Sequence, residues 1–380
     1  MKGRELSEKR FRKLFLMMRG AGIPLYMKNT SIFFKVYSYL VTVCMLCTII
    51  TIFIGTVTNS DCLKRIMQNV RVSFAMLDMS VAYIFIRFFH DRIEYLISLT
   101  EEFTWDELPK SNEFRMTSWI ERVQTLGKYI CIIVLSYHYI QSTVRIITLQ
   151  EIVFDAWFPF DTSVSPTFEI IIFFQLLASV AIICIFAGYL PLNCIFIAVA
   201  CSQLENLAFE LKSLKQNCEI EEQLRNWILY HQKTLRFVKA IEDMLSTYIG
   251  VQMIPLYLGP CLSAFSAITS WNDFTDQTQA FVAVSVFFCQ ASVLCWFGTQ
   301  LTESAENVKR AAWECDWIGA PIPMQKTILF IISRGNKDTE ITAGKFVPLS
   351  NVTLLHMMND CVSIFMFLLN VKERKERQHD

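Results

Sequence analysis

The sequence is poor in the residues that build tight turns and polar surfaces. Its 380 residues include only 12 glycines and 10 prolines, and 18% of them are charged, against about 25% in a typical soluble protein. Scarce glycine and proline argue against a β-sandwich rich in turns. The 35 basic and 35 acidic residues cancel, so the composition does not indicate a nucleic acid or an acidic protein as partner.

Recognisable catalytic motifs are also missing. The chain contains no HExxH, GxSxG, GxxxxGK[ST] or GxGxxG pattern. Its five histidines are scattered over separate segments, and the 13 cysteines lie mostly inside apolar stretches, where cysteine behaves as a small hydrophobic residue. We therefore expect a protein that is not an enzyme and that holds no metal or other cofactor.

Hydrophobic residues, in contrast, are abundant, since they make up 53% of the chain and include 31 phenylalanines. A helix needs about 20 mostly apolar residues to cross roughly 30 Å of hydrocarbon. Seven stretches reach or approach that length, which predicts a single all-α integral membrane domain with seven transmembrane helices. The predicted spans are residues 32–57, 66–89, 127–149, 168–201, 245–271, 278–302 and 347–371.

The second predicted span is unusual because Arg71, Asp78 and Arg87 interrupt it. A charge at membrane depth is costly, and it usually faces the interior of the bundle or a water-filled cavity. We therefore expect polar contacts inside the protein near Asp78, with pairing to a neighbouring residue as the simpler alternative.

The distribution of basic residues favours one orientation in the membrane. The segments that share a side with the N-terminus carry eight, six, six and six lysines or arginines, whereas the three opposite loops carry two, one and none. Lysine and arginine concentrate in cytosolic loops, and the first 31 residues lack the apolar core of a secretory signal. These patterns predict a cytosolic N-terminus and an extracellular C-terminus, although four basic residues in the tail 372–380 run against the rule.

Some predicted helices are longer than a bilayer is thick. Residues 168–210 continue with few helix breakers, and residues 220–244 place apolar side chains at three- and four-residue spacing ahead of the fifth span. A short amphipathic helix at 324–334 follows the sixth span. Only protein neighbours could bury such apolar stripes outside the membrane. We therefore predict that these helices extend into a packed cytosolic anchor layer, which we place at a subunit contact.

The C-terminal third contains a distinctive set of residues at fixed spacing. The set comprises Cys295, Gly298, Leu301, Ser304, Val308, Ala311-Ala312-Trp313-Glu314, Trp317, Ile341-Thr342-Ala343-Gly344-Lys345-Phe346 and Leu349-Ser350. A second set is His231, Leu235, Phe237 and Ile241-Glu242. Together they resemble the signature of the insect odorant receptor family over about residues 285–372, with Trp313 where tyrosine is usual.

Other classes with a similar number of spans remain as alternatives. The sister gustatory receptors end in Thr-Tyr, five residues, then Gln-Phe, whereas this chain has Ser363-Ile364 and Asn370-Val371 in that register, which favours an odorant receptor. A G-protein-coupled receptor would have the opposite orientation. A transporter is indicated only by the number of spans and the interior charges.

The resemblance implies a tetrameric cation channel in the plasma membrane of a sensory neuron dendrite, opened by a small volatile ligand. Most members of the family bind the ligand and assemble with a shared co-receptor subunit. The co-receptor is expected to be longer, with an insert in the second cytosolic loop that this chain lacks. We therefore interpret the chain as a ligand-tuning subunit of a heterotetramer that contacts the co-receptor and membrane lipid.

The resemblance also assigns positions in the pore. Phe367 and Val371 of the last helix would form a hydrophobic gate, and Asn370 beside them would be a polar pore position. An apolar constriction can stop ions by excluding water, without a plug. The periodicity of the last helix alone is equally compatible with Phe367 and Val371 facing lipid or a neighbouring helix.

The ligand of such a receptor is expected in the outer half of the bundle, among the second, third, fourth and sixth spans. Residues three or four apart share a helix face, and aromatic walls with one or two polar groups suit a small volatile. Packing without a ligand is the alternative for each residue. The candidates are Phe74 with Leu77, Tyr137 with Gln141, Phe173 with Leu177, and Val284 with Phe287 and Phe288.

Overall fold

The structure is a computed structural model, and it describes residues 10–25, 30–58, 63–103, 115–162, 164–213, 220–270, 273–336 and 339–377. Within these ranges, seven helices are long and apolar enough to cross a membrane. The predicted all-α fold with seven spans is therefore confirmed. The seven helices are α3 (Ile32–Thr58), α4 (Leu63–Phe88), α6 (Arg115–Val144), α7 (Thr167–Ser213), α8 (Ile220–Thr269), α9 (Phe274–Glu314) and α11 (Asn351–Glu376).

Shorter elements flank and connect these helices. The α6 helix starts at Arg115, well before the predicted third span, and α11 starts at Asn351, because the residues before it form a hairpin. The short helix expected at 324–334 corresponds to α10. The shorter elements are α2 (Arg12–Gly20), α5 (His90–Thr100), the π-helical turn η1 (Arg145–Leu149), α10 (Ile322–Gly335), β1 (Thr342–Ala343) and β2 (Val347–Pro348).

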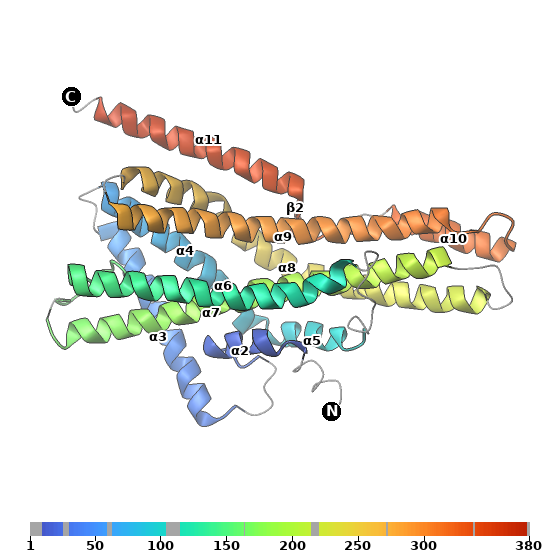
Figure 1. Cartoon of the computed structure of the whole chain (residues 1–380), viewed down its shortest axis with the longest axis horizontal. Helices are drawn as coiled ribbons and strands as arrows, with labels where there is room; N and C mark the ends of the chain where they lie inside the picture. Colours follow the sequence, from blue (N-terminus) through green and yellow to red (C-terminus); the bar gives the residue numbers. More distant parts are fainter. Residues whose placement is uncertain are drawn as a thin grey trace.

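Three long helices give the molecule its elongated shape (Figure 1). The helices α7, α8 and α9 contain 47, 50 and 41 residues, so at 1.5 Å per residue they extend roughly 60 to 75 Å. A bilayer core takes up only about 30 Å of that length. The remainder projects at the end that carries α10, which we call the inner end. The end at which α4, α7 and α9 begin is the outer end.

The middle of α7 is the centre of the packing. Residues 191–204 are all buried, because α6, α8, α9, α2 and α3 all contact this helix. A helix that is apolar on every side is stable only when neighbours surround it completely. This explains why α7 can continue far beyond the thickness of a bilayer without exposing hydrophobic surface along its middle.

The charged residues of the second span face protein, as expected. Arg71 and Asp78 are only 3% and 0% exposed. Asp78 accepts hydrogen bonds from Gln252 of α8 and Gln290 of α9, and Arg87 donates to three hydroxyl groups of α3 and α4. Polar contacts therefore connect α4 to its neighbours at both ends and in the middle.

A short hairpin attaches the start of α11 to α8. The backbone N–H of Thr342 donates to the carboxylate of Glu242 (2.9 Å), and the N–H of Gly344 donates to the carbonyl of Ser246 (2.8 Å). At the tip, Gly344 and Lys345 both have positive φ, 61° and 64°, as a type I′ hairpin turn requires. These residues of the C-terminal pattern therefore fix the point at which the last helix begins.

A close backbone contact attaches the same segment to α9. A Cβ atom on Gly298 would lie 2.1 Å from the carbonyl oxygen of Leu349, so only glycine fits at this position. At the next residue of α9, the hydroxyl of Thr299 accepts a hydrogen bond from the backbone N–H of Asn351 (2.9 Å). The start of α11 is thus held by α8 on one side and α9 on the other.

We predict that Gly298→Ala lowers the free energy of unfolding by about 1 to 3 kcal/mol, the usual cost of overpacking, because the new methyl group meets backbone that cannot rotate away. Thermal unfolding of the purified protein in detergent measures the effect. Gly188→Ala is the matched control, since a Cβ there meets only the flexible side chain of Met18 at 3.2 Å. Equal losses in the two variants would contradict the proposed role of Gly298.

Candidate ligand-binding site

A cavity of about 210 Å³ lies at the outer end between α4, α6 and α9. We call it the outer cavity. The connection between η1 and α7 forms its cover. Its lining residues are Gln68, Asn69, Arg71, Val72, Ala75, Met76, Tyr137, His138, Gln141, Ser142, Arg145, Val153, Phe154, Asp155, Asp276, Gln279 and Ala283.

The cover of the outer cavity is held by backbone hydrogen bonds. The N–H of Phe154 donates to the side-chain oxygen of Gln175 (3.0 Å), whose amide nitrogen donates back to the Phe154 carbonyl (3.1 Å). The Phe154 ring stacks on His138 with 5.9 Å between centroids. A further bond runs from the N–H of Trp157 to the carbonyl of Thr51 (3.0 Å). The cover is therefore fixed to α7, α6 and α3.

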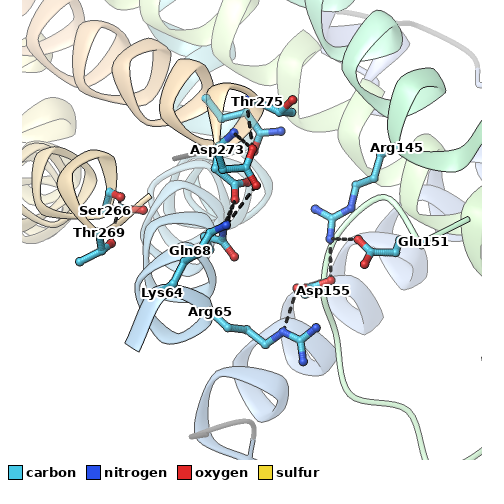
Figure 2. A network of polar contacts seen from close by, with 12 residues as sticks. Lys64, Arg65, Gln68, Arg145, Glu151, Asp155, Ser266, Thr269, Asp273 and Thr275 are labelled. Atoms are coloured by element: carbon cyan, nitrogen blue, oxygen red, sulfur yellow. Dashed lines mark hydrogen bonds and ion pairs between the residues drawn. The ribbon is translucent and has the colours of Figure 1, made fainter. Parts of the chain in front are cut away.

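Ion pairs form one side of the rim (Figure 2). Arg145 donates to Glu151 at 3.1 Å and to Asp155 at 2.6 Å, and the Nε of Arg65 lies 3.8 Å from Asp155. The carboxylate of Asp155 thus interacts with two guanidinium groups, one from η1 and one from the first turn of α4. This arrangement links α4 to the cover.

A second polar group joins α4 to the start of α9, also seen in Figure 2. Lys64 lies 3.0 Å from Asp273 and 3.5 Å from Asp276, and Gln68 donates to Asp276. Asp273 in turn accepts from the N–H groups of Thr275 (3.1 Å) and Asp276 (3.3 Å). It therefore caps the N-terminus of α9, where negative charge is favourable.

Arg71 lies deeper than the rim and joins three helices. Its guanidinium donates to the hydroxyl of Ser266 on α8 (3.1 Å), to the backbone carbonyl of Asp276 (3.2 Å) and to the side-chain oxygen of Gln279 on α9 (3.2 Å). All three acceptors are neutral. Within the described residues this buried cation forms no ion pair with a carboxylate.

Several buried polar atoms around the outer cavity have no hydrogen-bond partner among the described residues. They include the hydroxyl of Tyr137, the side-chain oxygen of Gln141, the amide nitrogen of Asn69 and the Nε of Arg145. Native proteins pair nearly all of their buried polar groups. Residues that line the cavity therefore carry unused hydrogen-bonding capacity.

The nine residues predicted to contact the ligand fall into two groups. Tyr137 and Gln141 line the outer cavity, whereas the other seven do not. Phe173 and Leu77 are 60% and 43% exposed, and Phe287 is buried among core residues of α8, α9 and α11. Leu177 packs on the main core. The remaining three, which are half-buried, are Phe74, Val284 and Phe288.

Nine polar lining residues were absent from the predicted set, namely Gln68, Asn69, Arg71, His138, Ser142, Arg145, Asp155, Asp276 and Gln279. The sequence carried a signal for Arg71, His138 and Arg145, since an ionisable residue inside a predicted span by default indicates a functional position. The predicted aromatic walls differ from the observed lining, which is mostly polar and charged.

The predicted gate residues lie on the exposed face of α11. In this helix, Met357 and Cys361 are buried, and its neighbours are α8 and α9. Phe367 is 65% and Val371 48% exposed, and Asn370 is exposed as well. Their role in a pore stays a prediction, because it concerns the surface that other subunits would share.

A larger groove of about 1060 Å³, which we call the lateral groove, runs along α6, α7 and α9. Its lining is almost wholly apolar, and some of its side chains, such as Leu126 (51%) and Phe281 (57%), are largely exposed on the flank of the bundle. Apolar side chains on the flank of a membrane helix suit contact with lipid. We therefore take the outer cavity, with its convergent polar groups, as the candidate ligand site.

The fold and the cavity together define a class: a seven-helix membrane protein with an internal, ligand-sized outer cavity and a last helix that leaves one face exposed. The sequence matches the 7tm odorant receptor family over residues 62–362. The chain therefore belongs to this family, the insect odorant receptors, and the predicted resemblance is confirmed. This is a family of receptors and not of enzymes.

Individual relatives are distant. Putative odorant receptor 92a of Drosophila melanogaster is 25% identical over 145 residues, covering 38% of this chain and 35% of the relative. The odorant receptor coreceptor of Ooceraea biroi is 22% identical over 160 residues, or 42% and 33%. Odorant receptor 30a of D. melanogaster is 26% identical over 211 residues, or 54% and 55%. The chain thus spans between about a third and about half of the length of these relatives.

The fold is similar to that of the insect olfactory receptor OR5 from Machilis hrabei, a structure determined in complex with eugenol. The TM-score is 0.80 at 21% identity, and the match covers 97% of this chain and 99% of OR5. This likeness confirms the arrangement of helices. Receptors and co-receptors are similar to this chain at comparable identity, so the role of the chain within a complex is a separate question.

We predict that Gln175→Leu loosens the cover of the outer cavity, because it leaves the N–H and carbonyl of Phe154 without partners. Each buried polar group left unpaired costs about 1 to 3 kcal/mol. Hydrogen exchange of the peptide around Phe154 should become faster. Gln141→Leu is the control, since its oxygen has no partner among the described residues. Unchanged exchange in Gln175→Leu would show that other contacts hold the cover.

Proposed function

We propose that the chain is the odorant-binding subunit of a heteromeric cation channel in the plasma membrane, opened by a small volatile in the outer cavity. The observation that carries the proposal is a cavity with unpaired polar groups whose walls include α9 and a side chain bonded to α8. These are the two helices on which α11 packs. The family to which the chain belongs supports the same function.

The coupling between ligand and pore follows from these contacts. Arg71 is hydrogen-bonded to α8 and α9 at the outer end, and the hairpin fixes the start of α11 to α8 near the middle of the long axis. A ligand that moves α8 relative to α9 would therefore tilt α11 about a held starting point. A ligand opens the channel only if it binds the open state more tightly than the closed state.

The pore in this proposal is formed by the exposed faces of α11 from four subunits. The side chains of Phe367 and Val371 form the apolar constriction, with Asn370 beside them. One or more of the subunits is the shared co-receptor, and this chain supplies ligand specificity. A gustatory-type channel, a transporter and a G-protein-coupled receptor are the alternatives that recordings can separate from this proposal.

We predict that cells expressing this chain with an insect co-receptor show a cation current when exposed to a panel of volatiles. The current should persist when G-protein signalling is blocked, and it should be absent without the co-receptor. Absence of current despite surface expression of both chains, across a wide panel, would contradict the proposal. A current without the co-receptor would indicate a channel that needs no second type of subunit.

Variants in the same recordings separate ligand binding from gating. Ala283→Leu fills the outer cavity and should raise the half-maximal ligand concentration at least tenfold, since overpacking costs about 1 to 3 kcal/mol. Ser285→Leu is its control, because Ser285 lines the lateral groove instead.

Val371→Ala widens the proposed gate and should raise the basal current. Val352→Ala, at an exposed position near the start of α11, should leave the basal current unchanged.

A further inference from the structure

The outer cavity offers a ligand more hydrogen-bond donors than acceptors. Arg71 has five N–H groups and makes three hydrogen bonds within the described structure. The hydroxyl of Tyr137 and the Nε of Arg145 are buried and have no partner there. Among the unpaired atoms of the lining, the side-chain oxygen of Gln141 is an acceptor. A ligand that satisfies this lining must therefore bring acceptor atoms.

The charges around the cavity add a second requirement. Both carboxylates of the lining are engaged by cations of the rim: Asp155 interacts with Arg145 and Arg65, and Asp276 with Lys64. The guanidinium of Arg71 has only neutral hydrogen-bond acceptors, and the carboxylate of Asp276, which attracts it without a direct ion pair, is shared with Lys64. A buried charge is expensive unless a partner compensates for it. The position next to Arg71 therefore favours negative charge.

The volume and the lining of the outer cavity limit the size and the polarity of the rest of the ligand. At about 30 Å³ per water-sized atom, a cavity of about 210 Å³ holds roughly seven non-hydrogen atoms. The apolar part of the lining includes Val72, Ala75 and Met76 on α4 and Ala283 on α9. Val72 directly follows Arg71, whereas Ala75, Met76 and Ala283 lie about one helical turn further from the outer end than Arg71 or Gln279. The cavity therefore has a polar outer part and a short apolar inner part.

Building on the proposed function, we infer that the ligand of this receptor is a small carboxylic acid, bound as its carboxylate. The carboxylate lies against Arg71, whose planar guanidinium matches two carboxylate oxygens, and the hydroxyl of Tyr137 donates to it. The alkyl chain of the acid fills the space beside Val72, Met76 and Ala283. The ligand thereby supplies a charged hydrogen-bond acceptor, which the three present acceptors of Arg71 are not.

This assignment discriminates among volatiles of equal length. An alcohol or aldehyde fits the apolar part but gives Arg71 no charged hydrogen-bond acceptor. An amine that carries a positive charge is repelled by Arg71 and Arg145. The order of potency expected from these charges is therefore acid first, neutral compounds next, and amine last.

The test uses cells that express this chain together with the co-receptor. The probes are hexanoic acid, hexanol, hexanal and hexylamine, applied over a range of concentrations. We expect the half-maximal concentration of the acid to be at least tenfold lower than that of hexanol. We also expect the potency of the acid to follow its ionised fraction as the external pH is moved across the pKa of the acid, while the potency of hexanol stays constant.

Variants test whether Arg71 is responsible for the preference for the acid. Arg71→Gln should raise the half-maximal concentration of the acid at least tenfold and change that of hexanol little. Arg87→Gln is the matched control, since Arg87 also donates to hydroxyl groups but lies about 24 Å away along the same helix at 1.5 Å per residue. Should Arg71→Gln fail to reach the cell surface, Tyr137→Phe removes a single hydroxyl and should weaken the acid alone.

The outcomes separate this inference from the proposed function. A current evoked by neutral volatiles at lower concentrations than by the acid would overturn the ligand class and leave the receptor function intact. An acid response that Arg71→Gln and Tyr137→Phe leave unchanged, at normal surface expression, would overturn the binding mode. The absence of current with any compound, while both chains reach the surface, would count against the proposed function itself.

Discussion

The contacts of Arg71 determine how the outer half of the molecule holds together. One guanidinium reaches α8 and α9 from α4, and the cavity lies beside it. Lipid cannot hydrate a charge, so a cation at this depth must be satisfied by protein, water or a ligand. The polar residues of α6, α8 and α9 gather around Arg71 for that reason, and they leave room that hydrocarbon side chains would have filled.

In the middle of the molecule, close packing between the helices limits movement. The buried middle of α7 and the contact between Gly298 and Leu349 leave little space for rearrangement. Hydrogen bonds from backbone N–H groups of the hairpin to Glu242 and Ser246 fix the start of α11 in the same region. A polar, partly unsatisfied outer end and a densely packed middle together suit a device in which ligand binding moves one end of a helix while the other end is held.

The sequence predicted those features that depend only on consecutive residues. Hydropathy and periodicity predicted the seven membrane helices and α10, since a span depends on its own composition. The strands of the hairpin are only two residues long and carry no periodic signal. Tyr137 lines the outer cavity, whereas Phe287, which shares the same kind of helical spacing, packs into the core. Which face of a helix meets a cavity depends on the neighbours of that helix, and a single-helix pattern does not contain that information. Arg71 was recognised as an interior charge but not as a lining residue of the outer cavity, because its hydrogen-bond partners come from helices more than 190 residues away in the sequence.

The central claim is that a ligand in the outer cavity moves α11 through α8 and α9. A cryo-electron microscopy comparison of this chain with its co-receptor, with and without an activating volatile, tests it most directly. We expect ligand density beside Arg71 and Tyr137 and a displacement of the outer part of α11, with the hairpin unmoved. Ligand density in the lateral groove, or an open pore with α8 and α9 unchanged relative to each other, would contradict it.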